Sequence, residues 1–183
     1  MQKDGLMSVV VQVVLLAIVA LSTNVAELTN QLVLGGQLAF CAMSILMLSR
    51  KSLINAVLFS IATLLIATSF WLRATPPLHW WIPTALLAGF VVLYLLILPQ
   101  IDHRWGAIAV LGVFLLHLMW ASLELWVEYH QWQSVMAFIG SLLCCISALI
   151  YSVKAGHFTN RTPLTTCFLV SLVLLTLPYA VAN

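Results

Sequence analysis

Long apolar stretches, separated by short polar segments, follow one another along the whole chain. Seven stretches are found: Leu6–Ser22, Gln31–Leu48, Leu53–Leu72, Trp81–Leu98, Gly106–Trp126, Val135–Val153 and Leu164–Ala182. A helix needs about 17–25 residues to cross a hydrocarbon core of about 30 Å, and each stretch falls in or near that range. Because backbone polar groups cannot stay unpaired in lipid, such stretches form helices. The pattern predicts an all-α, polytopic transmembrane helix bundle of about seven helices, a single domain over residues 1–183.

The first stretch has two interpretations, because Gln12 interrupts it and it lies at the N-terminus. It resembles a signal peptide in position. The apolar part of a signal peptide has only about 7–15 residues, however, and this stretch is longer. We therefore expect Leu6–Ser22 to be an uncleaved helix.

The composition excludes a water-soluble domain. Apolar residues make up 63% of the chain and charged residues 7%, whereas soluble domains carry about 25% charged residues. The net charge is +2, and no basic run with interleaved aromatic residues occurs, so nucleic acid is not an expected partner. Membrane lipids and other membrane proteins are the expected partners.

Basic residues are distributed unevenly between the two ends of the predicted helices. If each predicted helix crosses the membrane once, the connections between them lie alternately on its two sides. Six of the seven Lys and Arg then fall on the side of the N-terminus: Lys3, Arg50, Lys51, Arg104, Lys154 and Arg161. Arg73 falls on the opposite side. Short cytoplasmic loops carry an excess of Lys and Arg. The N-terminus is therefore predicted in the cytoplasm and the C-terminus outside, in a cell membrane such as the bacterial inner membrane.

His117 and Glu124 are the most informative polar residues inside the predicted helices. They are seven residues apart, so they share a helix face and lie about 10 Å apart along the axis. Glu124 is near the outer end and is expected to reach water. His117 needs a partner from another helix, and the candidates are Gln12, Gln37, Asn55, Ser60 and Thr63. A structural hydrogen bond is one interpretation of His117, and proton transfer or head-group binding is the other.

Further polar residues gather at the predicted outer rim: Glu27, Arg73, His79, Glu124, Glu128 and His130. No H-x-x-x-H or H-E-x-x-H spacing occurs among them, so we interpret them as solvated loop residues and predict neither a metal nor a cofactor. The four cysteines all fall inside predicted helices: Cys41, Cys144, Cys145 and Cys167. Without paired spacing they are expected to be buried free thiols.

Small residues recur at spacings that allow helices to approach closely. Gly35, Gly36 and Ala39 form one such surface, and Gly140–Cys145 contains another. In membranes, small residues four apart favour close helix contact. The second and sixth helices are therefore predicted to lie at the packed centre.

Several segments resemble one membrane protein family. Asn55–Ser60 is similar to the "GLLFS" opening of a helix in the YhhN-like family, the lysoplasmalogenases. His117–Ala121, Gly140–Ala148 and Tyr179–Asn183 resemble later segments of that family, in the same order. The resemblance implies a bundle of transmembrane helices that acts on ether lipids.

The chain departs from the family's pattern at two positions. The family has an Asp after "LFSxxG" and another after the Ser of "SD", where this chain has Thr63-Leu64 and Ser147-Ala148. The resemblance implies that those carboxylates activate water against a vinyl-ether lipid. We therefore expect a noncatalytic lipid-binding protein or accessory membrane subunit. The alternatives are a divergent lysoplasmalogenase-like hydrolase and a small transporter, which would need broken helices at mid-membrane.

The predicted topology is tested by reporter fusions. Fusions after Lys51, Arg104 and Gly156 should report the cytoplasm, and fusions after Pro77 and His130 should report the outside, because basic loops stay in the cytoplasm. Activity of paired cytoplasmic and periplasmic reporters measures the side. Finding Arg104 and Pro77 on the same side would contradict the seven-helix prediction.

Overall fold

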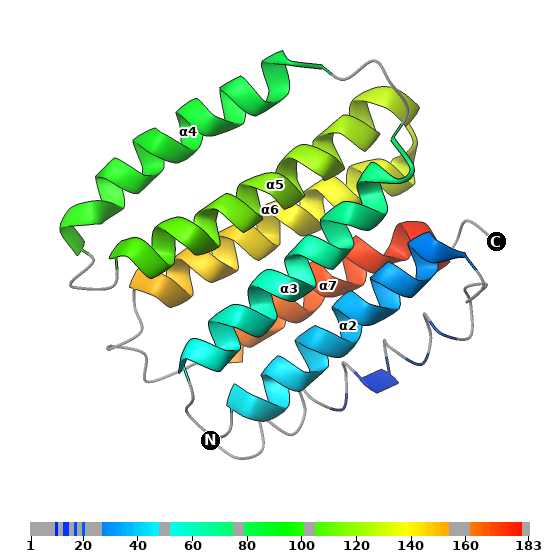
Figure 1. The fold of residues 1–183 in the computed structure, drawn as a ribbon, viewed down its shortest axis with the longest axis horizontal. Coiled ribbons are helices and arrows are strands. Elements are labelled where there is room, and N and C mark those ends of the chain that lie inside the picture. Colours follow the sequence, from blue (N-terminus) through cyan, green and yellow to red (C-terminus); the bar gives the residue numbers. More distant parts are fainter. Residues whose placement is uncertain are drawn as a thin grey trace.

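The computed structural model describes residues 27–47, 52–74, 79–100, 105–153 and 162–180, with isolated positions from 10 to 20. These residues form six α-helices (Figure 1): α2 (Leu28–Met47), α3 (Ser52–Trp71), α4 (Trp81–Ile97), α5 (Trp105–Tyr129), α6 (Trp132–Val153) and α7 (Thr162–Ala180). A short 3-10 helix, η1 (Leu98–Gln100), follows α4, and no strand occurs in the described part of the chain. The prediction of an all-α fold is confirmed for the described residues, and six of the seven predicted stretches coincide with these helices. Most of Leu6–Ser22 lies outside the described residues.

Helices α2, α3, α5, α6 and α7 pack in this order, with α3 against α2 and α5, and α6 against α5 and α7. Three aromatic rings then join α7 to the first two described helices. The Phe40 ring of α2 lies 5.6 Å from the Phe59 ring of α3 and 5.4 Å from the Phe168 ring of α7. Phe59 and Phe168 are stacked with centroids 6.0 Å apart. The contacts therefore close α2, α3, α5, α6 and α7 around one apolar core.

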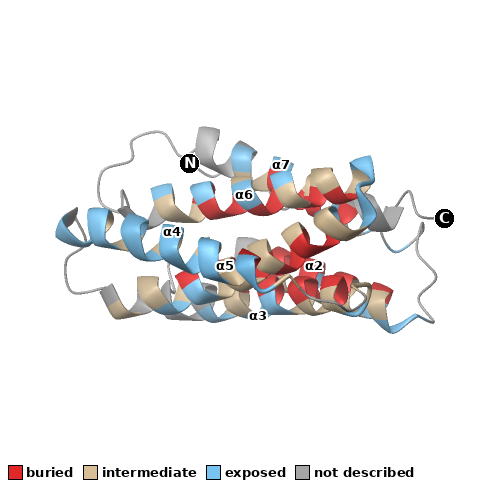
Figure 2. Cartoon of the chain, turned by 90° about the horizontal axis from the view of Figure 1, so that it is seen from above, coloured by how far each residue is buried: buried red, intermediate tan, exposed pale blue. Residues whose placement is uncertain are grey.

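Helix α4 stands apart from that core. It packs mainly on α5, and Figure 1 shows it on the far side of α5 from α2 and α3. Buried positions concentrate where the other helices face one another, whereas α4 is largely exposed (Figure 2). Ile82 is the one fully buried side chain described in this helix. Soluble monomers rarely expose a continuous apolar surface along a whole helix. The exposed face of α4 is therefore typical of a helix in contact with the hydrocarbon of a membrane.

Two described helices are long and apolar enough to cross a membrane. These segments are Ile108–Tyr129 and Trp132–Ile150. Shorter apolar segments occur at Val57–Trp71, Trp81–Ile97 and Cys167–Thr176. The six basic residues assigned to the cytoplasmic side, Lys3, Arg50, Lys51, Arg104, Lys154 and Arg161, lie outside the described residues. The orientation of the termini therefore stays a prediction.

Glycines lie where two helices touch, as the small-residue pattern predicted. A Cβ atom on Gly140 of α6 would lie 2.9 Å from the backbone N of Leu175 and 3.0 Å from the carbonyl O of Ser171, both in α7. A Cβ atom on Gly36 of α2 would lie 3.2 Å from the carbonyl O of Ala62 in α3. Helix α6 packs on both α5 and α7, in line with its predicted place at the packed centre, whereas α2 packs mainly on α3.

Serine and cysteine side chains on the same helices lie in different surroundings. The Ser141 and Ser122 hydroxyls hydrogen-bond across α6 and α5 at 2.8 Å. Cys41, Cys144 and Cys145 are buried free thiols, as predicted, but Cys167 is exposed. The prediction for Cys167 is wrong because this residue lies on a face of α7 that packs on no described helix there.

The close approach of α6 to α7 predicts opposite effects for two glycine substitutions. Gly140→Ala should lower thermal stability, because rigid backbone of α7 occupies the space of the added methyl group. Gly89→Ala on α4 meets nothing within 4 Å, so it should keep or raise stability by up to about 1 kcal/mol through helix propensity. Thermal unfolding of the detergent-solubilised variants, followed by circular dichroism, measures both. Equal effects of the two substitutions would contradict the described α6–α7 contact.

Candidate functional site

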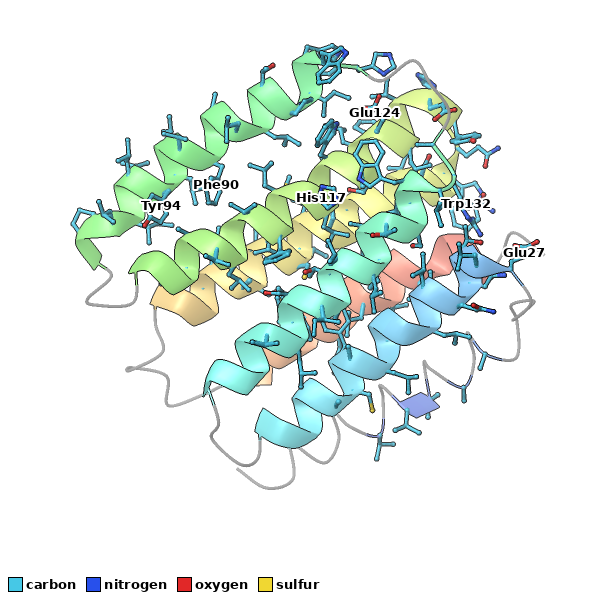
Figure 3. All side chains as sticks on the ribbon, in the orientation of Figure 1. Glu27, Phe90, Tyr94, His117, Glu124 and Trp132 are labelled. Carbon is cyan, nitrogen blue, oxygen red and sulfur yellow. The ribbon has the colours of Figure 1, made fainter. Side chains whose placement is uncertain are left out.

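One face of α5 carries the residues with the most chemistry in the described part of the chain. His117, Trp120 and Glu124 follow one another at spacings of three and four, so they lie one above the other. Trp71, the last residue of α3, packs against this face. Its ring centroid lies 4.9 Å from that of Trp120, nearly perpendicular to it, and 6.1 Å from that of His117. Figure 3 shows Glu124 near the end of α5 and His117 nearer its middle.

Glu124 is a buried carboxylate held by a single residue. Its relative exposure is 2%. One carboxylate oxygen, Oε1, accepts a hydrogen bond from the backbone N–H of His79 at 2.7 Å and lies 2.9 Å from Nδ1 of the same residue. The His79 side chain is 40% exposed. Because His79 comes just before α4, this contact joins the start of α4 to the end of α5.

The other oxygen of Glu124, Oε2, is buried without a hydrogen-bond partner. The indole nitrogens of Trp71 and Trp120 are also buried without one. Two donors and one acceptor at the junction of α3 and α5 are thus unpaired, at a cost of about 1–3 kcal/mol for each buried group. Native structures leave few buried polar groups unpaired, so this junction is a candidate binding site.

The prediction that Glu124 reaches water is wrong. The carboxylate lies under the connection from α3 to α4, which places His79 against it. His79 was predicted to be a solvated loop residue, and its ring and backbone instead contact this carboxylate. The sequence did not indicate the pairing because the two residues are 45 positions apart.

His117 contacts α3, one of the helices that carry its candidate partners, but through ring stacking. Its ring is partly buried and stacks on Trp71, with the two ring planes inclined by 30°. Among the described residues none hydrogen-bonds to the His117 ring, and the Thr63 hydroxyl donates to carbonyls of its own helix. The amide of Gln37 is buried without a partner. The side chain of Asn55 lies outside the described residues, as does Gln12.

The remaining residues of the predicted outer rim have separate roles. The carbonyl of Arg73 accepts a hydrogen bond from the Tyr129 hydroxyl at 2.8 Å, a second link between the end of α3 and α5. His130 is exposed, and its φ of 50° lets α5 end and α6 begin two residues later. Asn30 donates a long hydrogen bond to Glu27 at 3.4 Å. No group of three His, Cys, Asp or Glu side chains that could hold a metal is found among the described residues.

Sequence reasoning missed Trp71 and Trp120 as members of the site. A Trp at the end of a predicted transmembrane helix, such as Trp71, is typical of the head-group zone and does not by itself indicate a site. The available signal was the spacing of Trp120, four residues before Glu124 and three after His117. This spacing places all three side chains on the face that α3 covers.

A model of the YhhN family matches residues 6–179 of the chain. The match contains five of the described helices completely and all of α7 except its last residue. It therefore includes every residue of the site around Glu124. No curated protein and no solved structure matches the chain.

Substitutions of Glu124 should separate its hydrogen bond from its charge. Glu124→Leu removes both acceptor contacts with His79, so it should lower stability by about 1–3 kcal/mol. Glu124→Gln keeps a carbonyl oxygen for the His79 N–H and should lose less. Glu128→Leu, on the same helix but partly exposed, is the control. Thermal unfolding in detergent measures the three variants, and equal losses for Glu124→Gln and Glu124→Leu would contradict the role of this hydrogen bond.

Proposed function

Because the chain belongs to the YhhN family, we propose that it is a multi-pass protein of the cell membrane that binds a membrane lipid with the lipid's polar end at Glu124. Membership of this lysoplasmalogenase-like family supports a location in the membrane. The apolar surfaces of its helices agree with a lipid environment. The proposal concerns what the polar site does there.

The unpaired Oε2 of Glu124 is the observation that carries the proposal. A buried carboxylate oxygen without a partner is costly, and a hydroxyl or ammonium group of a ligand would satisfy it. The indole N–H groups of Trp71 and Trp120 would donate to oxygen atoms of the same ligand. Lipid head groups and glycerol backbones supply groups of these kinds.

The depth of the site in the membrane fits a lipid head group. Trp80 and Trp81 directly follow His79 and are 74% and 58% exposed. Exposed Trp residues prefer the boundary between hydrocarbon and water, where the ring is apolar and the N–H meets polar groups. Glu124, bonded to His79, therefore lies at about the level of the lipid head groups.

We further propose that binding takes place without hydrolysis, as in an accessory lipid-binding subunit. The two positions where the family pattern places Asp carry Thr63-Leu64 and Ser147-Ala148. The Thr63 hydroxyl is engaged within α3. The Ser147 hydroxyl is buried and unpaired, and a hydroxyl is a far weaker base than a carboxylate. Neither position offers a carboxylate to activate water.

The pairing of Glu124 with His79 favours a second candidate, a hydrolase of vinyl-ether lipids. Hydrolysis adds one water across the vinyl ether to give a hemiacetal, which separates into an aldehyde and a free alcohol. Protonated His79 would deliver a proton to the vinyl carbon, and Glu124 would accept one from the attacking water. The 2.9 Å contact between the two side chains supports this division of roles.

Purified protein in nanodiscs should bind a lysoplasmalogen without releasing aldehyde. Glu124→Leu should weaken binding by about 10- to 150-fold, since a lost hydrogen bond to a charged group is worth about 1.5–3 kcal/mol. Binding is measured with radiolabelled lipid and aldehyde with a coupled dehydrogenase. Unchanged binding by folded Glu124→Leu would contradict the proposed site. Aldehyde release that Glu124→Gln abolishes and Glu128→Gln retains would establish the hydrolase instead.

A further inference from the structure

We propose that the recess between α4 and α5 binds the hydrocarbon chain of a membrane lipid, and that the ring of Phe90 controls access to it. This inference rests on the proposed function, because the polar end of the same lipid would lie at Glu124. It adds a second subsite at a distance from the first. The ligand class is an amphiphile with a polar group at one end and an unbranched apolar chain.

The recess has uncharged walls. Phe90, Tyr94 and Ile97 line it from α4, Leu111 and Leu115 from α5, and Leu149 from α6. Figure 3 shows Phe90 and Tyr94 extending from α4 toward α5. Their rings stack with centroids 6.0 Å apart and form a continuous wall. No charged side chain lines the recess, so a polar ligand would lose its hydration there without compensation.

Phe90 occupies the space that a chain would need. Its ring lies directly against Gly112 of α5, where an added Cβ atom would collide with the outer ring atoms. Phe90 itself is only partly buried, and α4 has no other large contact apart from α5. A phenylalanine ring moves aside by changing its side-chain rotamer without any backbone movement. Such a movement would open the recess along α4 and α5.

The position of the recess relative to Glu124 indicates a single chain as its occupant. Phe90 comes nine residues after Trp81, the first residue of α4, which corresponds to about 14 Å at a rise of 1.5 Å per residue. Half of a hydrocarbon core is about 15 Å thick. A lipid with its polar end at Glu124 would therefore reach the recess with the far part of its chain. The polar site at Glu124 and the uncharged recess match the two ends of such an amphiphile.

The recess does not fit a helix of a second copy of this chain. Packed helices need axes about 8–10 Å apart, and α5 and α6 already provide two of the walls. The outward side of α4, with exposed residues such as Val92, Leu95 and Leu96, is open to bulk lipid. The recess differs from that side because three helices line it.

Photolabelling with a single-chain lipid that carries a diazirine at its chain end tests the inference. The label should attach to peptides containing Phe90–Ile97 and Ile108–Leu115. Gly112→Leu fills the recess and should reduce this labelling by about tenfold, the effect of leaving about two methylene groups unburied. Gly89→Leu, which adds the same side chain to α4 in open space, should leave it unchanged. Phe90→Ala should increase it.

The possible outcomes distinguish failure of the chain subsite from failure of the proposed polar site. Labelling spread evenly over exposed faces such as Leu142 and Ile146, or equal labelling of Gly112→Leu and Gly89→Leu, would overturn the chain subsite. Cross-links between copies through α4 would overturn it in favour of a dimer. Total binding that is unaffected by Glu124→Leu would refute the polar site while leaving the chain labelling intact. If Gly112→Leu does not fold, Phe90→Ala and Phe90→Trp, with opposite expected signs, decide the question.

Discussion

The pairing of polar groups inside an apolar environment is the constraint on which the structure depends. Each helix satisfies its own backbone, and the hydroxyls of Thr63, Ser69, Ser122 and Thr176 donate to carbonyls of the preceding turn. With these groups paired locally, the helices present apolar surfaces to one another and to their surroundings. Three of the buried side-chain atoms that remain unpaired among the described residues lie at the α3–α5 junction, and a buried polar atom is costly to leave without a partner.

Helix association follows from the same constraint. Between apolar helices in lipid, contact depends on close packing and on occasional polar contacts rather than on the exclusion of water. Gly140 and Gly36 allow such packing, and the hydrogen bond between Ser122 and Ser141 adds to it. At α4 the corresponding contact is the Phe90 ring on Gly112. The hydrogen bonds between His79 and Glu124 are therefore important for holding the start of this helix near α5.

The two oxygens of the Glu124 carboxylate have different roles, one structural and one proposed to be functional. Oε1 accepts the hydrogen bond from His79, just before α4, whereas Oε2 is buried and unpaired. A ligand group bound by Oε2 would lie beside the start of the helix that forms one wall of the apolar recess. This arrangement links the proposed polar subsite to the proposed chain subsite through the orientation of α4.

The sequence predicted the six described helices, because the length and apolar character of each stretch are local properties. It also located the small residues at helix contacts and placed His117 and Glu124 on one face of α5, since both follow from helical periodicity. The tertiary structure decided that Glu124 is buried, that His79 is its partner, and that Trp71 and Trp120 complete the site. A carboxylate near a helix end reaches water or lies under a neighbouring segment depending on how that segment folds. Helical periodicity gives the face of a residue, but only the packing of distant segments determines what covers it.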